Sequence, residues 1–185
     1  MSRVKVHDKE FELYIPQDQI ERAIRKVADD INRDYAGKNP LFLVVLNGAF
    51  MFAAELFKNI EIECEISFVK LSSYSGTSST NFVRELIGLD HSIHGRNIVM
   101  VEDIIDTGLT MKFTVEKMLK LEANEVKIAT MLFKPKAFQL DYTIDMWELK
   151  FVMISSLAMV SITTNMPEIF LIFIKLYNKT NISLC

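Results

Sequence analysis

The stretch Val101-Glu102-Asp103-Ile104-Ile105-Asp106-Thr107-Gly108-Leu109-Thr110 decides the fold that we predict for this chain. It continues an apolar run that begins after Gly95, and it leads into a helix predicted from Thr110 to about Leu121. The segment from Val126 to Phe133 is again apolar and typical of a buried strand. Strand, glycine turn, helix and strand, in this order, predict a βαβ crossover in a parallel sheet.

The residues before this stretch follow the same alternation. Leu41 to Leu46 form the continuous apolar run LFLVVL, Asn47-Gly48 is typical of a turn, and Phe50 to Phe57 returns to helical character. An amphipathic helix is predicted upstream from apolar residues at helical spacing, namely Ile20, Ala23, Ile24, Val27 and Ile31. The sequence therefore predicts an α/β fold with a parallel sheet flanked by helices.

The composition favours a single domain that binds small molecules. A length of 185 residues suits one domain, and a formal net charge of -3 with interspersed charges gives no basic field for nucleic acid. The two cysteines, Cys64 and Cys185, form neither a disulfide framework nor a metal cluster, so we expect a cytoplasmic protein. The charged, alternating N-terminus lacks the apolar block of a signal peptide, and we expect no export.

The acidic stretch has the composition of a site for a sugar phosphate. Glu102 and Asp103 lie at the end of the predicted strand, where they would face a ribose. The backbone N–H groups of residues 106–110, with the hydroxyls of Thr107 and Thr110, would surround a phosphate at the positive end of the next helix. The alternative is a solvated strand end followed by a helix N-cap at Asp106, and spacing alone leaves both interpretations open.

The stretch VEDIIDTGLT is very similar to the motif with which type I phosphoribosyltransferases bind phosphoribosyl pyrophosphate (PRPP). LNGAFMFAAEL, SYSGTSST and FKPKAF stand in the order expected of the hypoxanthine (hypoxanthine-guanine) branch of that family, and the resemblance covers roughly Val4 to Asp145. It implies the type I phosphoribosyltransferase fold. It also implies a purine salvage enzyme that forms IMP (and GMP) plus pyrophosphate from hypoxanthine (guanine) and PRPP.

The resemblance assigns a role to each residue of the acidic motif. Glu102 and Asp103 would hold the ribose hydroxyls directly or through Mg²⁺, which makes them the expected metal ligands. Asp106 would lie beside N7 of the purine as the catalytic general acid/base. The residues expected to bind PRPP are Glu102, Asp103, Asp106, Thr107, Gly108, Leu109 and Thr110, the last four around the 5′-phosphate.

Three further segments receive roles from the resemblance. Lys134 would donate to the exocyclic O6 of the base and so favour hypoxanthine and guanine over adenine. Leu46, Asn47 and Gly48 would form the pyrophosphate loop, in which the family holds a strained, often cis, peptide. Ser73 and Tyr74 would belong to a flexible loop that closes over the site and excludes water. Without the resemblance, these are a surface lysine, an Asn-Gly turn and a linker.

The chain departs from the family after Asp145. Family members continue with a hood over the base that begins Tyr-Val-Gly, whereas residues 151–176 here are apolar without a steady period. Back-translation of Met-Trp-Glu at 146–148 as ATG TGG GAA, after an Asp codon ending in T, contains TAT GTG GGA, which encodes Tyr-Val-Gly. We therefore predict a phosphoribosyltransferase domain at 1–145 and an aberrant tail at 146–185, a frameshift product that disrupts the hood. Polar residues interrupt the tail and argue against the rival interpretation, a membrane anchor.

The altered tail leaves three functional alternatives. The first is a transferase with impaired activity whose PRPP half survives; the second is a binding or regulatory protein that keeps the PRPP fold without transfer. The third is a transferase of the same fold that uses xanthine or a pyrimidine. Asp106 together with Lys134 favours an enzyme, but Lys134 alone does not decide the base. The expected partners are the purine base and PRPP, with neither nucleic acid nor a membrane. The resemblance also implies a homo-oligomer, because dimers or tetramers are usual in the family.

Overall fold

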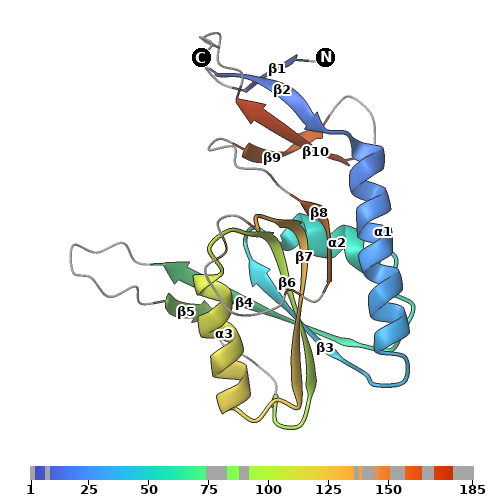
Figure 1. Cartoon of the computed structure of the whole chain (residues 1–185), viewed down its shortest axis with the longest axis vertical. Coiled ribbons are helices and arrows are strands. Elements are labelled where there is room, and N and C mark those ends of the chain that lie inside the picture. Colours follow the sequence, from blue (N-terminus) through green and yellow to red (C-terminus); the bar gives the residue numbers. More distant parts are fainter. Residues whose placement is uncertain are drawn as a thin grey trace, which may run out of the picture. The chain divides into compact units, whose positions relative to one another are not determined.

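The computed structural model describes residues 3–6, 9–73, 83–87, 92–135, 138, 144, 146–150, 157–163 and 169–176. The chain forms two compact units, one of Met1–Arg22 with Met153–Cys185 and one of Ala23–Val152. The elements, in chain order (Figure 1), are β1 (Arg3–Val6), β2 (Lys9–Ile15), α1 (Gln17–Asp34), β3 (Leu41–Leu46), α2 (Phe50–Phe57), β4 (Glu65–Ser73), β5 (Val83–Ile87), β6 (Asn97–Ile105), α3 (Leu109–Lys120), β7 (Glu125–Phe133), β8 (Met146–Lys150), β9 (Leu157–Thr163) and β10 (Ile169–Leu176).

The larger unit contains a six-stranded sheet in the order β5-β4-β3-β6-β7-β8. The neighbours from β4 to β8 pair in parallel, and β5 is antiparallel to β4. Helices lie on both faces: α3 packs against one, and α1 and α2 lie on the other (Figure 1). The predicted α/β class, a parallel sheet flanked by helices, is thus confirmed.

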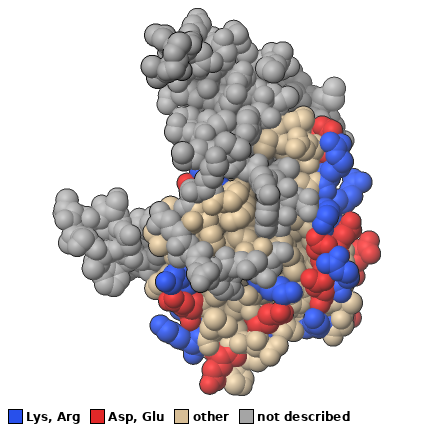
Figure 2. All heavy atoms as spheres, viewed as in Figure 1, with Lys and Arg blue, Asp and Glu red and all other residues tan. Residues whose placement is uncertain are grey.

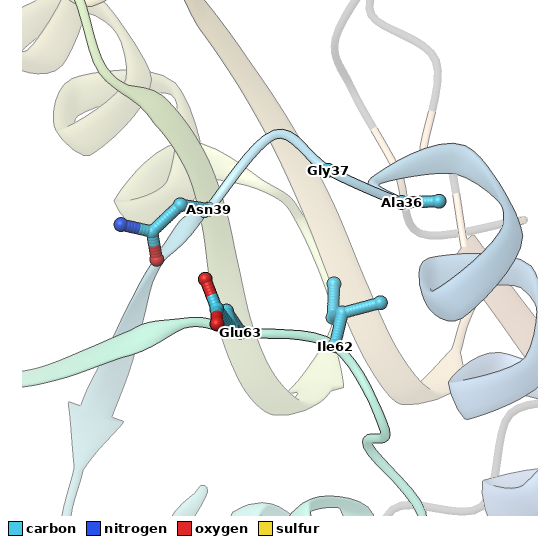
Figure 3. A pocket seen from close by; sticks show the side chains of 5 residues that line it. All are labelled: Ala36, Gly37, Asn39, Ile62 and Glu63. Carbon is cyan, nitrogen blue, oxygen red and sulfur yellow. The ribbon is translucent and has the colours of Figure 1, made fainter.

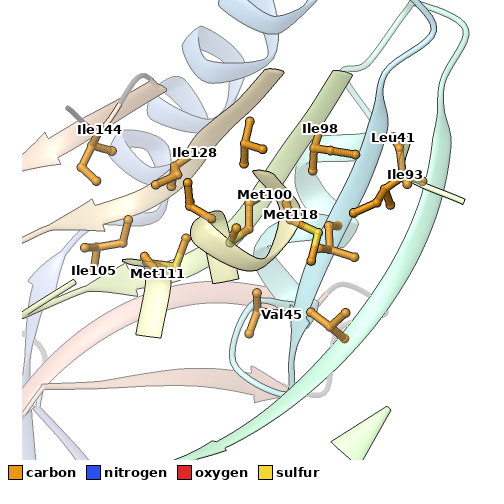
Figure 4. Packing of buried hydrophobic residues seen from close by; sticks show 14 of the residues in the cluster. Leu41, Val45, Ile93, Ile98, Met100, Ile105, Met111, Met118, Ile128 and Ile144 are labelled. Carbon is orange, nitrogen blue, oxygen red and sulfur yellow. The ribbon is translucent and has the colours of Figure 1, made fainter. Parts of the chain in front are cut away.

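The apolar runs of the sequence become strands that are buried on both faces. Every residue of β3 from Leu41 to Val45 is buried. Alternate side chains of a strand point to opposite faces, and Leu41, Leu43 and Val45 join the core cluster that includes Met111 and Met118 of α3 (Figure 4). On the other face, the ring of Phe42 meets that of Phe57 edge to face at 5.0 Å between centroids. The central strand is thereby fixed by packing on both sides.

The predicted crossover is present in the form β6–α3–β7. The helix begins at Leu109 and ends at Lys120, within one residue of the predicted bounds at each end. Gly108 precedes it with φ 82°, in the left-handed region that glycine adopts without the steric penalty of a Cβ. This glycine lets the chain turn sharply from the end of β6 into the helix.

The amphipathic helix α1 carries its charges on the exposed face. Asp18 pairs with Arg22 at 2.7 Å, and Asp30 pairs with Lys26 at 3.0 Å and with Arg33 at 2.6 Å. Lys and Arg are interspersed with Asp and Glu along the side where α1 lies (Figure 2). Exposed pairs of this kind contribute only about 0.3–0.5 kcal/mol each, so α1 is held mainly by its buried face.

The smaller unit is an antiparallel sheet in the order β1-β2-β10-β9. β8, by contrast, continues the parallel sheet beyond Asp145, because Met146 pairs with Ala129 of β7 and is only 3% exposed. The boundary between the compact units falls after Val152. The domain boundary at 145/146 and the frameshift remain predictions. Among the described residues, no helix has the length and apolar character that crossing a membrane requires.

Candidate active site at the carboxyl ends of three adjacent strands

The predicted site residues follow three strands that are neighbours in the sheet. Residues 46–48 end β3 and start the next turn, residues 102–110 include the end of β6 and the start of α3, and Lys134 follows β7. Since these strands are adjacent and parallel, their carboxyl ends open on one edge of the sheet. Ligands of open α/β sheets bind outside this edge.

The loop between β6 and α3 is the segment predicted to bind the 5′-phosphate. Asp106 is exposed, Thr107 is half-buried and Gly108 is buried. The Thr107 hydroxyl lies 3.5 Å from the backbone N of Leu109 and accepts its hydrogen bond. The first turn of α3 contains no acidic residue, so its own side chains place no negative charge at the helix N-terminus. The Thr110 side chain lies outside the described atoms.

The two adjacent carboxylates are largely withdrawn from water. Burial raises the pKa of Glu102 from its ordinary value of 4.5 to about 8, and the neighbouring charge of Asp103 adds to the effect. Burial also raises the pKa of Asp103, although its Oδ1 accepts a hydrogen bond from the Ile104 N–H at 2.9 Å. A pair of buried carboxylates is an environment that a bound cation stabilises.

The loop after β3 reaches the second of these carboxylates. The peptide bond between Leu46 and Asn47 is cis, the geometry that the resemblance implied. At Gly48, an added Cβ would lie 2.7 Å from Oδ2 of Asp103 and 2.8 Å from its Oδ1. A side chain at position 48 would therefore force the loop or the carboxylate of Asp103 to move, whereas glycine lets the two approach each other.

The structure brings the two predicted base-recognition residues together. Lys134 Nζ donates a hydrogen bond to Asp106 Oδ2 at 2.8 Å, with the lysine side chain 19% exposed and the aspartate 54%. The Lys134 backbone N–H donates to the carbonyl of Ile105 at 3.0 Å, and its carbonyl accepts from Phe138 at 3.2 Å. These backbone bonds place Lys134 beside the end of β6.

Some predicted residues are not tested by the geometry. Ser73 is the last residue of β4, but its side chain and the whole of Tyr74 lie outside the described residues, so the flexible loop remains a prediction. Within the described residues, no group of three or more His, Cys, Asp or Glu side chains could hold a metal ion. Glu102 and Asp103 therefore form an incomplete ligand set by themselves.

Thr130 is a residue at this site that sequence reasoning did not identify. It lies within β7, is completely buried, and places its hydroxyl 3.3 Å from the carbonyl oxygen of Asp103. Its neighbours in the strand, Ala129 and Met131, are buried and apolar. A single hydroxyl residue in an apolar strand was the available signal, but its partner could not be seen without the sheet register.

A pocket of about 320 Å³ lies elsewhere in the same unit. Its lining comes from the turn before β3 and the segment before β4 (Figure 3), namely Ala36, Gly37, Asn39, Ile62 and Glu63. These segments precede their strands, so the pocket lies at the amino ends of β3 and β4 rather than at the carboxyl ends. It is therefore separate from the acidic motif.

Comparison with known proteins shows the family to which the chain is similar. The phosphoribosyl transferase domain family matches residues 15–152. The chain is 45% identical to a hypoxanthine-guanine phosphoribosyltransferase of Streptococcus pyogenes serotype M3 over 125 aligned residues. These residues make up 67% of this chain and 69% of that protein. Its fold is similar to the crystal structure of a hypoxanthine-guanine phosphoribosyltransferase from Bacillus anthracis, with a TM-score of 0.71, 32% identity, and 76% and 84% of the two chains covered. It is also similar to the Trypanosoma cruzi hypoxanthine phosphoribosyl transferase, with a TM-score of 0.72, 27% identity, and 80% and 82% covered.

Proposed function

Because this chain belongs to the phosphoribosyl transferase domain family, we propose that it is a purine salvage transferase. It forms IMP and pyrophosphate from hypoxanthine and PRPP, and GMP from guanine. The observation that carries the proposal is the 2.8 Å contact between Lys134 and Asp106, in the loop between β6 and α3. Relatives named hypoxanthine-guanine phosphoribosyltransferases, at 40–45% identity, support the same substrates.

The contact between Lys134 and Asp106 suits one edge of an oxopurine. Hypoxanthine and guanine carry the acceptor O6 next to N7, whereas adenine carries an amino group in the place of O6. The lysine ammonium has three N–H donors and the ionised carboxylate only accepts. The pair can therefore donate to O6 and accept the proton of N7 at once. Adenine would turn its own donor toward the ammonium, so the site favours hypoxanthine and guanine.

The proposed reaction joins the base to the ribose in one displacement. N9 of the purine forms a bond to C1′ while the bond from C1′ to the pyrophosphate oxygen breaks. Asp106 takes the proton from N7, so that the nucleotide leaves with a neutral base. The backbone of residues 107–110 holds the 5′-phosphate at the N-terminus of α3. Leu46, Asn47 and Gly48 hold the leaving pyrophosphate.

The residues present fit a magnesium ion that is shared with the substrate. Mg²⁺ prefers oxygen ligands and is commonly bound through one or two carboxylates together with substrate phosphates. Glu102 and Asp103 supply two oxygen donors, and burial raises the pKa of both carboxyl groups. Bound there, Mg²⁺ would neutralise the charge of PRPP and of the departing pyrophosphate. The two residues would hold the ribose hydroxyls of PRPP directly or through the ion.

A coupled nucleotide assay tests the proposed function. The chain is incubated with PRPP, Mg²⁺ and one base at a time, namely hypoxanthine, guanine, xanthine or adenine, and nucleotide formation is followed. We expect IMP and GMP at a reduced rate, no AMP, and a rate from Asp106→Asn that is lower than that of the parent by about 100-fold or more. PRPP binding without any nucleotide would favour the alternative, a regulatory protein with the PRPP fold; product from xanthine alone would reassign the base.

We also propose that residues 146–185 derive from a displaced reading frame and that this change impairs activity. The family match ends at residue 152, and back-translation with freely chosen third bases permits, in the displaced frame, a sequence like the hood that family members carry over the base. For the Trypanosoma cruzi relative, a role of the C-terminal region in oligomeric state and enzymatic activity has been described. Sequencing the DNA across the codons for Asp145 and Met146 tests the proposal. One extra base there would support it, and a chain with wild-type-like turnover would contradict the impairment.

The oligomeric state and the cellular compartment are part of the same proposal. We expect a homo-oligomer in the cytoplasm, where the half-buried, free Cys64 would stay reduced. Light scattering after size exclusion, at several protein concentrations, would report the oligomeric state. A mass equal to one chain at all concentrations would contradict the homo-oligomer.

A further inference from the structure

Asp103 lies between two pairs of the ladder that joins β6 to β7. The two strands pair in parallel, with Glu102 opposite Thr130 and Ile104 opposite Leu132. The carboxylate of Asp103 also lies next to Gly48 of the predicted pyrophosphate loop. Asp103 therefore links the end of β6 to the loop after β3.

The hydroxyl of Thr130 adds a side-chain contact from β7 to the backbone of Asp103. Thr130 Oγ1 lies 3.3 Å from the carbonyl oxygen of Asp103 and 3.2 Å from the carbonyl oxygen of Leu132. A threonine hydroxyl has one proton to donate, so the two carbonyls share one donor. The Thr130 side chain is fully buried, and water cannot readily take its place. A buried carbonyl that loses such a donor carries a penalty that an exposed one does not.

Asp103 is then held at three points. Its carbonyl accepts from Thr130, its Oδ1 accepts from the N–H of Ile104 at 2.9 Å, and its carboxylate faces Gly48. The first of these points is a side-chain contact from the neighbouring strand β7. A change of the peptide plane at Asp103 would turn the carboxylate away from the position in which it meets both the sugar and the loop.

We propose that Thr130 is a positioning residue for PRPP binding, acting through the backbone of Asp103. The proposal rests on the proposed function, because it takes Asp103 to bind the ribose of PRPP or its magnesium ion. Thr130 itself touches no substrate. Partners in the outer shell of a metal or ligand site typically change affinity by about 10- to 100-fold when they are removed, and we expect an effect of this size.

The purely local interpretation is that the hydroxyl only satisfies Leu132 within its own strand. This interpretation predicts that loss of the hydroxyl lowers stability and leaves the affinity for PRPP unchanged. The two interpretations separate in the substitution Thr130→Val, which keeps the branched shape and removes the donor. Thr130→Ser keeps the donor and removes the methyl group.

The test measures PRPP binding by titration calorimetry in saturating Mg²⁺, using the full chain and the variants T130V and T130S. We expect the Kd for PRPP to rise about 10-fold or more in T130V and to stay within about 3-fold of the parent in T130S. The matched control is T114V, which removes the hydroxyl of another buried threonine, on α3, and should stay within about 3-fold of the parent. Unfolding by heat reports the stability of each variant separately.

Each result of the test has a definite meaning. Equal affinity in T130V and the parent, or equal weakening in T130V and T130S, would overturn the role of Thr130. If the parent itself fails to bind PRPP, the proposed function falls and the role of Thr130 falls with it. If T130V does not fold, T130C takes its place, because cysteine keeps a weaker donor. PRPP affinity more than about 3-fold below that of T130S would then support the proposal, and equal affinity would overturn it.

Discussion

Nζ of Lys134 lies 2.8 Å from Oδ2 of Asp106, although 28 positions separate the two residues in the sequence. The contact joins the end of β7 to the loop after β6, and the backbone bond from Lys134 to the carbonyl of Ile105 supports it. The resemblance assigned these residues to O6 and N7, which are adjacent atoms of one purine edge. Their proximity means that a single base can meet both side chains.

Replacement of Lys134 by alanine should weaken nucleotide binding and reduce discrimination. The loss of a charged hydrogen bond to O6 is expected to lower the affinity for IMP by about 10- to 100-fold, and to lower the affinity for AMP much less. Titration calorimetry with each nucleotide measures both effects without requiring turnover. The control is Lys120→Ala, at the exposed end of α3. An unchanged ratio of IMP to AMP affinity would show that Lys134 does not read O6.

Replacement of Asp106 by asparagine should affect chemistry more than binding. Asparagine keeps the size of the side chain but cannot accept the N7 proton as a carboxylate does, so kcat is expected to fall by about 10²- to 10⁴-fold. The affinity for PRPP should change little, because the proposed contacts to the 5′-phosphate come from residues 107–110. Coupled assay and calorimetry report the two quantities separately. A variant that keeps the parent kcat would exclude Asp106 as the general acid/base.

Replacement of Gly48 by alanine should disturb Asp103. The new Cβ would lie 2.7 Å from Asp103 Oδ2, so the loop or the carboxylate has to move and the Kd for PRPP is expected to rise about 10-fold or more. Gly37→Ala is the control. Gly37 has space around it but a φ of +72°, so its substitution should cost roughly 1 kcal/mol of stability and leave PRPP affinity intact. Equal PRPP affinity in both variants would contradict the contact between Gly48 and Asp103.

Stability should fall with rising pH because of Glu102. The pKa of Glu102 is raised to about 8 in the folded chain, so between about pH 4.5 and 8 the folded state keeps a proton that the unfolded state has lost. Unfolding free energy therefore decreases with pH across this window, by at most about 1.4 kcal/mol per pH unit from this group.

Urea unfolding at pH 5, 6, 7 and 8, without Mg²⁺ or PRPP, measures this dependence. Glu102→Gln should flatten it, whereas Glu116→Gln, on the exposed side of α3, should keep it. Saturating Mg²⁺ with PRPP should also reduce the pH dependence of stability. Ligands that bind the ionised carboxylate of Glu102 compete with its protonation. A parent chain whose stability rises between pH 5 and 8 would contradict the burial of Glu102.

The sequence predicted the crossover well because packing and chain geometry both act locally there. Apolar runs at 41–46 and 126–133 become buried strands, and Gly108 marks the start of α3 in the way its left-handed φ requires. The order of the strands in the sheet, by contrast, could not be predicted from local sequence patterns. β3 lies between β4 and β6, and no local pattern in LFLVVL reveals which strands will be its neighbours.

The contacts that complete the site could not be predicted from local patterns. Gly48 meets Asp103 and Lys134 meets Asp106 across pairs of adjacent strands, so each contact depends on sheet register. Thr130 was missed for the same reason. Residues 146–150 were assigned to the aberrant tail, and no strand was predicted there. In the structure they form β8, which pairs with β7 in the parallel sheet.

The position of β3 at the centre of the sheet has a consequence for the order of synthesis. Its pairing with β4 joins nearby parts of the chain, but its pairing with β6 joins residues 41–44 to residues 98–101. The acidic motif and the loop at Gly48 can therefore come together only after β6 has left the ribosome, while β9 and β10 are still to be made. Because domains fold as units during translation, beginning with the N-terminal part of the chain, we expect both segments of the PRPP half of the site to have emerged before β9 and β10, the two strands that lie in the tail.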